Sequence, residues 1–282
     1  MKKITRRSFM AAAGLTVAAL ALTACGGSSS TASSAAASSV ASSAAASSEA
    51  ASAAATELTT VEAGKLTMAT NAAFPPYEMT TDAGEFEGID IETAQAIADK
   101  LGLELQIDDM DFDAALLSVQ QGKADIVMAG VTVTDERKAV MDFSDSYATG
   151  IQSIIVPEGS DITSPDDLAG KKIGTQRGTT GYIYCSDDFG DENVVAYDDG
   201  LTAVQALNNG QVDAVVIDNA PAQEFIAANP GLKILDTSYA EEDYAIGMAK
   251  GSSLEDAVNA ALKELKADGT LQSIVDKYIT AE

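Results

Sequence analysis

The sequence contains no histidine and no tryptophan, and only two of its 282 residues are cysteine. Without histidine, neither a Ser-His-Asp triad nor a Cys-His pair can form, and zinc lacks its usual nitrogen ligand. We therefore expect no catalytic residues of these kinds, no metal site and no cofactor.

Basic residues are scarce as well. The chain has 17 Lys and Arg against 43 Asp and Glu. Four of the basic residues lie within the first seven positions, so the rest of the chain has 13 basic and 43 acidic residues. Such a charge argues strongly against nucleic acid as a partner. It suits a domain that does not adhere to anionic lipid, although ordinary solubility explains it equally well.

The N-terminus has the pattern of an export signal. Lys2, Lys3, Arg6 and Arg7 precede an apolar run over residues 10–24. This run is shorter than the ~20 residues of a membrane-spanning helix and is typical of a signal peptide. We expect residues 1–24 to be removed after export by the general or the twin-arginine route, since residues 5–9 (TRRSF) resemble a twin-arginine motif.

A tether is expected next. Residues 22–26 (LTACG) resemble the lipobox of bacterial lipoproteins, which implies cleavage before Cys25 and a lipid on its sulfur. Of residues 26–56, 25 are Ala or Ser, a composition that favours a flexible coil, so we assign residues 25–64 to the lipidated cysteine and its tether. Cys185 is then the remaining thiol, without a disulfide partner, and we expect it to be a small buried residue.

From residue 65 onward, predicted strands alternate with predicted helices. The pattern gives strands at 65–70 and 103–107, a helix before Gly102, a helix at 113–121 and a strand at 125–128. This alternation favours an α/β fold with a mostly parallel sheet. Ligands of such sheets bind beyond the carboxyl ends of the strands. Asn71, Phe112 and Gly130 lie at three of these ends.

Arg137 is the most informative single residue. It follows the strand that ends at Gly130 and lies in the first turn of a helix capped by Thr134, where the helix dipole does not favour a cation. A carboxylate ligand held bidentately would account for this position. The alternative is an ion pair with Asp135 or Glu136 on a solvated face.

A faint internal repeat directs attention to Asp218. Residues 115–130 and 203–218 share a helix, a glycine stop and an Asp-led apolar strand at a constant offset of 88. We interpret this as one supersecondary unit used twice. Asp218 then occupies the strand end that corresponds to Gly130. The alternative role for Asp218 is a helix cap before Asn219.

The second half contains a further candidate binding loop. Residues 176–181 (QRGTTG) follow a strand and lead into a helix, so main-chain N–H groups are available there. Other expected elements are strands at 151–156, 233–235 and 244–248, an amphipathic helix at 252–266 and a last helix at 271–279.

Several of these motifs resemble the polar amino-acid class of bacterial extracellular solute-binding proteins, the binding subunits of ABC importers. The resemblance covers about residues 65–279, and one departure is Thr93, where the family usually has an aliphatic residue. The motifs are Phe74-Pro75-Pro76-Tyr77, Gly88-Ile89-Asp90-Ile91-Glu92, Thr132-Val133-Thr134-Asp135-Glu136-Arg137, Phe143-Ser144, Gly178-Thr179-Thr180 and Asp218.

The resemblance implies a two-lobed periplasmic-binding-protein-like fold of type II, in which hinged lobes close on the ligand. The first lobe would comprise residues 65–154 and 241–282 and the second residues 155–240, with crossing strands near 153–157 and 236–244. The protein would be a monomer, lipid-anchored at the outer face of the cytoplasmic membrane. Its partners would be a free L-amino acid and the permease subunits of an ABC transporter.

The resemblance also implies site roles. Arg137 would bind the ligand α-carboxylate with Thr132 and the N–H of Thr180. Asp218 would bind the α-ammonium with the carbonyl of Gly130 and the hydroxyl of Thr132. Phe74 and Phe112 would enclose the ligand side chain, while Asn71, Gln176 and Thr179 would complete the site. Two alternatives stay open: the two phenylalanines could be plain core residues, and Thr179 and Thr180 could simply cap their helix.

Ligand identity is less constrained. Asn71 and Gln176 are neutral amides, which favours a neutral polar amino acid, with a basic one as the second choice because the lobes are acidic. Two other functions are considered: an enzyme on the same fold, similar to cyclohexadienyl dehydratases, and a ligand-sensing module. The loop at 176–181 offers no acid for catalysis, and a sensor would need a spanning helix after the second lobe. We expect neither.

Overall fold

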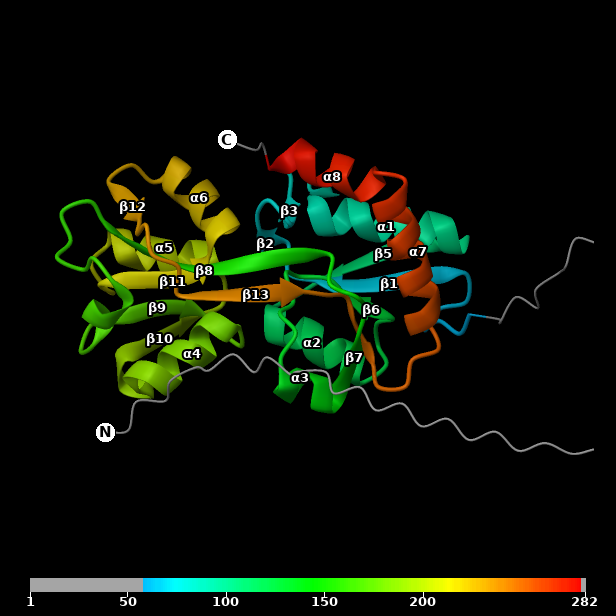
Figure 1. Cartoon of the computed structure of the whole chain (residues 1–282), viewed down its shortest axis with the longest axis horizontal. Helices are drawn as coiled ribbons and strands as arrows, with labels where there is room; N and C mark the ends of the chain where they lie inside the picture. The colour runs from blue at the N-terminus through cyan, green and yellow to red at the C-terminus, as the bar shows by residue number, and fades with distance from the viewer. Residues whose placement is uncertain (1–57, 280–282) are drawn as a thin grey trace, which may run out of the picture. The chain divides into compact units, whose positions relative to one another are not determined.

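The structure is a computed structural model that describes residues 58–279 (Figure 1). The expected signal peptide, Cys25 and most of the expected tether lie outside the described residues. Within residues 58–279, no helix combines the length and the apolar character needed to cross a membrane.

The first lobe is built on a five-stranded sheet. Its strands lie in the order β5 (Glu104–Asp109), β1 (Lys65–Thr70), β6 (Ile126–Val127), β14 (Gly247–Ala249) and β7 (Met141–Phe143). Strand β1 pairs in parallel with β5 and β6, and β14 is antiparallel to both of its neighbours. The side elements are α1 (Ile89–Leu101), α2 (Phe112–Gln120), α3 (Asp135–Val140), α7 (Glu255–Ala267), α8 (Thr270–Tyr278) and a small sheet of β2 (Ala73–Phe74), β3 (Glu78–Thr80) and β4 (Phe86–Glu87).

The second lobe has a sheet of its own. Its order is β10 (Val194–Tyr197), β9 (Ile173–Gln176), β11 (Ala214–Asp218), β8 (Ala148–Pro157) and β12 (Leu232–Ile234), with β13 (Ala240–Tyr244) also paired to β8. Its helices are α4 (Thr180–Phe189), α5 (Gly200–Asn208) and α6 (Asn219–Ala228), with short 3₁₀ turns η1 (Pro165–Leu168) and η2 (Asp191–Asn193). Strands β9, β10 and β11 run parallel to one another, as the alternating pattern predicted.

Two antiparallel strands carry the chain between the lobes. Strand β8 pairs with β13 from Gln152↔Ala240 to Ala148↔Tyr244, and β13 is followed by β14 of the first sheet. Figure 1 shows both strands running between the two groups of helices. This is the expected two-lobed α/β arrangement. The expected lobe boundaries at 154/155 and 240/241 fall inside continuous strands, so they stay a prediction.

The expected single strand at 244–248 is wrong, because β13 ends at Tyr244 and β14 begins at Gly247. Ala245 and Ile246 between them are fully buried, so the apolar run is continuous in sequence although the chain changes sheets there. Other expected bounds also shift, by one to three residues. Phe112 is the first residue of α2 instead of preceding it, and α7 begins at Glu255, three residues later than predicted, because the hydroxyl of Ser252 accepts the N–H of Leu254 in the preceding turn.

The internal repeat is confirmed as one supersecondary unit used twice. Gly122 and Gly210 end their helices with φ of 65° and 69°, a left-handed conformation that favours glycine. After them, Asp125 accepts the N–H of Thr67 at 2.8 Å, and Asp213 accepts the N–H of Lys172 at 2.8 Å. In each lobe this aspartate therefore ties its strand to the start of the neighbouring strand.

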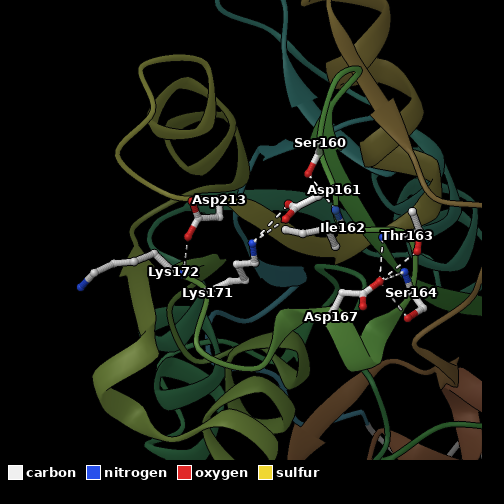
Figure 2. Close-up of polar contacts among 9 residues, drawn as sticks. All are labelled: Ser160, Asp161, Ile162, Thr163, Ser164, Asp167, Lys171, Lys172 and Asp213. Atoms are coloured by element: carbon white, nitrogen blue, oxygen red, sulfur yellow. Dashed lines mark hydrogen bonds and ion pairs between the residues drawn. The ribbon is translucent and has the colours of Figure 1, made fainter.

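Side-chain bonds also order the connection between β8 and β9 (Figure 2). The carboxylate of Asp167 accepts the N–H and the hydroxyl of both Thr163 and Ser164, at 2.9 to 3.1 Å. These bonds hold the pKa of Asp167 below its ordinary value. Lys171 pairs with Asp161 at 3.2 Å just before β9. This part of the second lobe carries no predicted site residue.

Candidate ligand-binding site

A small cavity, about 20 Å³ in volume, lies between the two lobes. The carboxyl ends of β1, β9 and β11 border it, as expected for α/β sheets. Its lining comprises Asn71, Phe74, Glu78, Phe112, Ala129, Gly130, Thr132, Arg137, Gln152, Gln176, Thr179, Thr180, Val216, Ile217 and Asp218. All ten residues predicted from the sequence to contact a ligand are among them. What each does to a ligand stays a prediction.

Arg137 carries a positive charge into this cavity. Its side chain is buried, with 8% of the residue exposed. Nη1 donates to the carbonyl of Thr132 at 2.7 Å, and Nη2 donates to the carbonyl of Gly178, in the other lobe, at 3.1 Å. Burial lowers the pKa of Arg137, and the nearby carboxylate of Glu242 opposes that shift. A guanidinium has five N–H donors, so these two bonds leave donors for a ligand carboxylate.

The alternative reading of Arg137 is wrong. Within residues 58–279, Arg137 forms no ion pair with Asp135 or Glu136, and it does not lie on a solvated face. Its guanidinium instead lies over the ring of Phe112, 5.3 Å from the centroid. Thr134 caps α3 as predicted by accepting the N–H of Arg137 at 3.2 Å.

Asp218 provides the opposite charge from the second lobe, at the end of β11. One carboxylate oxygen accepts the amide of Gln152 at 2.7 Å, and the other accepts the hydroxyl of Tyr244. Although Asp218 occupies the cap position of α6, its side chain makes no cap bond, so the capping alternative is wrong. Burial raises the pKa of Asp218 to about 7, and the bond from Tyr244 opposes that rise.

The two phenylalanines are both core and cavity wall. Phe74 and Phe112 are 7% and 5% exposed, and each belongs to a hydrophobic cluster while also lining the cavity. Phe74 stacks on Tyr77 with ring centroids 6.0 Å apart. Gly130 has a φ of 54°, and a Cβ there would lie 2.8 Å from the ring of Phe74. The main chain of Gly130 can therefore approach that ring only because it is glycine.

Neutral polar groups join the lobes across the cavity. The amide of Gln176 donates to Asn71 Oδ1 at 2.9 Å, and the amide of Asn71 donates to the carbonyl of Met110 at 2.9 Å. Thr179 caps α4 by accepting the N–H of Tyr182 at 3.3 Å. Thr180 does not cap, since its hydroxyl donates to Glu242 at 2.9 Å. The capping alternative thus holds for Thr179 alone.

Sequence reasoning missed three polar residues at or beside the cavity: Glu78, Gln152 and Glu242. Glu78 is fully buried on β3, and burial together with the neighbouring carboxyl of Asp90 raises its pKa well above the ordinary value. Asp90 accepts the N–H of Gly130 at 3.0 Å and the hydroxyl of Tyr147 at 2.8 Å. Glu78 directly follows the Pro76-Tyr77 motif, a position that could have drawn attention to it.

Arg177 and Cys185 lie outside the lining, and Cys185 is the small buried residue that the sequence predicts. Arg177 is half exposed beside Asp198, and Cys185 is fully buried, which raises the pKa of its thiol to about 12. Within residues 58–279, no group of three or more His, Cys, Asp or Glu side chains is placed to hold a metal ion.

Comparison with known proteins identifies the family. The model for bacterial extracellular solute-binding proteins, family 3, matches residues 66–281. The L-cystine-binding protein TcyJ of Escherichia coli K12 is 33% identical over 226 residues, which cover 78% of this chain and 85% of TcyJ. The arginine-binding extracellular protein ArtP of Bacillus subtilis 168 is 33% identical over 228 residues, covering 77% of this chain and 87% of ArtP.

Solved structures of similar proteins support the same family. The arginine-, lysine-, histidine-binding protein ArtJ of Geobacillus stearothermophilus superposes with a TM-score of 0.74 at 34% identity, covering 77% of this chain and 96% of ArtJ. An ancestral arginine-binding protein bound to glutamine gives a TM-score of 0.74 at 41% identity, covering 78% of this chain and all of that protein. These relatives are binding proteins, not enzymes. The chain therefore belongs to the bacterial extracellular solute-binding proteins of family 3, and it serves as the amino-acid-binding component of an ABC importer.

Proposed function

We propose that the cavity encloses one free L-amino acid between the closed lobes. The observation that carries this proposal is the pair Arg137 and Asp218, two oppositely charged buried side chains that line one cavity from different lobes. Arg137 binds the α-carboxylate with Thr132 and the N–H of Thr180, and Asp218 binds the α-ammonium with the carbonyl of Gly130. Charge-assisted hydrogen bonds of this kind are roughly twice as strong as neutral ones.

The rings of Phe74 and Phe112 enclose the ligand side chain. Both are held by core packing, so little side-chain entropy is lost when a ligand enters. The lobes then close because the ligand contacts both of them, and closure is stabilised only by contacts that the open form lacks.

We propose a cationic side chain, of the arginine class, for this ligand. The sequence favoured a neutral one because Asn71 and Gln176 are amides, but these two bond to each other. Glu78 lines the cavity as well, and its buried carboxyl shares a hydrogen bond with the carboxyl of Asp90. A cation beside Glu78 would favour its charged form.

A neutral amide side chain is the second candidate. The amides of Asn71 and Gln176 support it, as does the glutamine bound to the ancestral arginine-binding protein. Both candidates keep the same contacts at the α-carboxylate and the α-ammonium, so they differ only at the side-chain end of the cavity.

Calorimetric titration of the purified mature chain with the twenty L-amino acids and cystine tests the proposal. We expect the tightest binding with L-arginine or L-lysine, and no binding with agmatine, which lacks the α-carboxylate. Tightest binding with L-glutamine would favour the second candidate. Binding of agmatine as tight as that of arginine would contradict the role of Arg137.

We further propose that the mature chain begins at Cys25, is lipid-anchored, and acts as a monomer at the outer face of the cytoplasmic membrane, where the Ala- and Ser-rich tether lets it meet the permease. The LTACG motif and the composition of residues 26–56 support this. Metabolic labelling with a radioactive fatty acid should mark the wild-type chain and leave Cys25→Ser unlabelled. Labelling of both would contradict the anchor.

A further inference from the structure

Glu242 is a buried carboxylate on one of the two strands that connect the lobes. It lies on β13 and is 7% exposed. Its Oε2 accepts three hydrogen bonds: from the hydroxyl of Thr132 at 3.2 Å, from the hydroxyl of Thr180 at 2.9 Å and from the amide of Gln152 at 3.0 Å. Thr132 belongs to the first lobe, Thr180 to the second and Gln152 to β8. One oxygen atom therefore joins both lobes and both crossing strands.

This carboxylate is costly to bury. Its other oxygen, Oε1, is buried and has no hydrogen-bond partner among the described residues, and Glu242 forms no ion pair within residues 58–279. A buried, partly unsatisfied carboxylate destabilises a fold unless something offsets it. Arg137 supplies part of the compensation, since the charge of Glu242 raises the pKa of Arg137 more than that of any other charged group. Packing alone would be served better by an apolar residue.

Glu242 also acts on Asp218 through Gln152. The Nε2 atom of Gln152 donates to Asp218 at 2.7 Å and to Glu242 at 3.0 Å, so both of its hydrogens are used. The other end of this amide has no hydrogen-bond partner among the described residues: Gln152 Oε1 is buried, and a Cβ at Gly181 would lie 2.8 Å from it. The orientation of Gln152, and with it the support of Asp218, therefore depends on Glu242.

We propose that Glu242 is a positioning residue that links the lobes in the closed arrangement and so sets the balance between open and closed protein. This role rests on the proposed function in one respect: Thr132, Thr180 and Asp218 are the residues that we propose contact the ligand. The bonds from Thr132 and Thr180 to one oxygen require both lobes to meet at β13. Contacts that exist only in the closed form shift the population toward it.

The test uses Glu242→Ala with Glu241→Ala as its matched control. Glu241 is the preceding residue on β13 and is exposed, so the control removes the same charge from the same strand without touching the lobe contacts. The radius of gyration is measured by small-angle X-ray scattering with no ligand and with saturating L-arginine and L-glutamine. The dissociation constant is measured by calorimetry.

We expect the Glu242→Ala protein to have a larger radius of gyration than wild type without ligand and the same radius at saturation. Its dissociation constant should rise about tenfold, because ligand binding must then drive closure without this link. Glu241→Ala should match wild type in both measurements. Glu242→Gln keeps an oxygen that can accept from both threonines, and it should restore the ligand-free radius of gyration in part.

A folded Glu242→Ala protein with an unchanged ligand-free radius and a dissociation constant within about twofold of wild type would overturn the inference. If Glu242→Ala does not fold, Thr180→Val, which removes one of the lobe contacts, is measured in the same way, with the same outcomes for and against. If wild type binds no amino acid, the proposed function fails, while the ligand-free radii still decide the role of Glu242.

Discussion

Arg137 holds its guanidinium in a buried cavity by donating to two main-chain carbonyls, at Thr132 and Gly178. Carbonyl dipoles compensate a buried cation less fully than a carboxylate does. Asp218 likewise lacks a cationic partner within the described residues and depends on Gln152 and Tyr244. Each of these charges would therefore gain an interaction if a zwitterion enters as proposed, and that interaction would offset the cost of burying them.

Replacing Arg137 by Ala should raise the dissociation constant at least about 100-fold, roughly 3 kcal/mol, because a desolvated ligand carboxylate would lose its charged partner. Calorimetry with the preferred amino acid measures this. Arg177→Ala is the matched control, since Arg177 is half exposed beside Asp198. An effect of less than about tenfold for Arg137→Ala would mean that Arg137 does not bind the carboxylate.

Asp218→Asn should remove amino-acid binding yet stabilise the fold above neutral pH. The pKa of Asp218 is raised from 3.8 to about 7, so the folded protein retains a proton there that the unfolded chain releases. The free energy of unfolding of wild type therefore falls as pH rises between these two values, by up to about 4 kcal/mol.

Urea unfolding of wild type and Asp218→Asn at about pH 4 and about pH 8 measures this difference. We expect the variant to be the more stable protein at the higher pH and the two to converge at the lower one. For the same reason, the affinity of wild type for its ligand should fall as pH drops below about 7, where Asp218 gains a proton. If the free energies of unfolding of the two proteins changed with pH in the same way, the raised pKa of Asp218 would not be the cause of the pH dependence.

Local sequence signals were sufficient for some site residues and insufficient for others. Arg137 is conspicuous because a cation in the first turn of a helix is unfavourable, and Asp218 because it ends a strand that repeats an earlier one. Glu242 has no such signal. It lies in a run of three acidic residues, and only the pairing of β13 with β8 decides that Glu242 is buried while Glu241 and Asp243 are exposed.

At the scale of elements, the crossing strands carry the geometry that the site depends on. Gly150 of β8 lies against the ring of Tyr244 on β13, and a Cβ there would lie 2.6 Å from the Tyr244 hydroxyl oxygen and closer still to the ring. Tyr244 in turn donates its hydroxyl to Asp218. Close packing of the two strands is thus coupled directly to Asp218, the residue that we propose binds the ligand ammonium.

Gly150→Ala should therefore destabilise the protein by about 1–3 kcal/mol, through overpacking, and also weaken ligand binding. Gly159→Ala is its control, because a Cβ at Gly159 meets nothing within 4 Å and its φ is ordinary. Urea unfolding gives the first effect and calorimetry the second. Equal stability of the two variants would show that Tyr244 can move aside freely.

Most strands and helices could be predicted from periodicity, while the change of sheet between β13 and β14 could not. Tyr244 to Met248 reads as one apolar strand because every residue in it is buried. Burial reports contact with a core, and here Tyr244, Ile246 and Met248 belong to one hydrophobic cluster although the chain changes sheets among them. The pattern of a single strand carries no information about which sheet it joins.

At the scale of the whole molecule, the charge predicts how a cationic ligand arrives. Without its first 24 residues the chain has 43 acidic and 13 basic residues, so its field attracts cations over about the 10 Å Debye length at 0.1 M salt. The association rate constant of L-arginine, measured by stopped-flow fluorescence or calorimetric kinetics, should fall as salt rises. That of L-glutamine should change little. Equal salt dependence for both would contradict electrostatic steering.

The central claim is that two hinged lobes neutralise the two ends of a zwitterion with opposed side chains from each lobe. A crystal structure of the protein grown with L-arginine tests it most directly. We expect the α-carboxylate to lie on the guanidinium of Arg137 and the α-ammonium on the carboxylate of Asp218, both within hydrogen-bond distance. An amino acid bound elsewhere, or bound in the cavity with Arg137 and Asp218 turned away from it, would contradict the account.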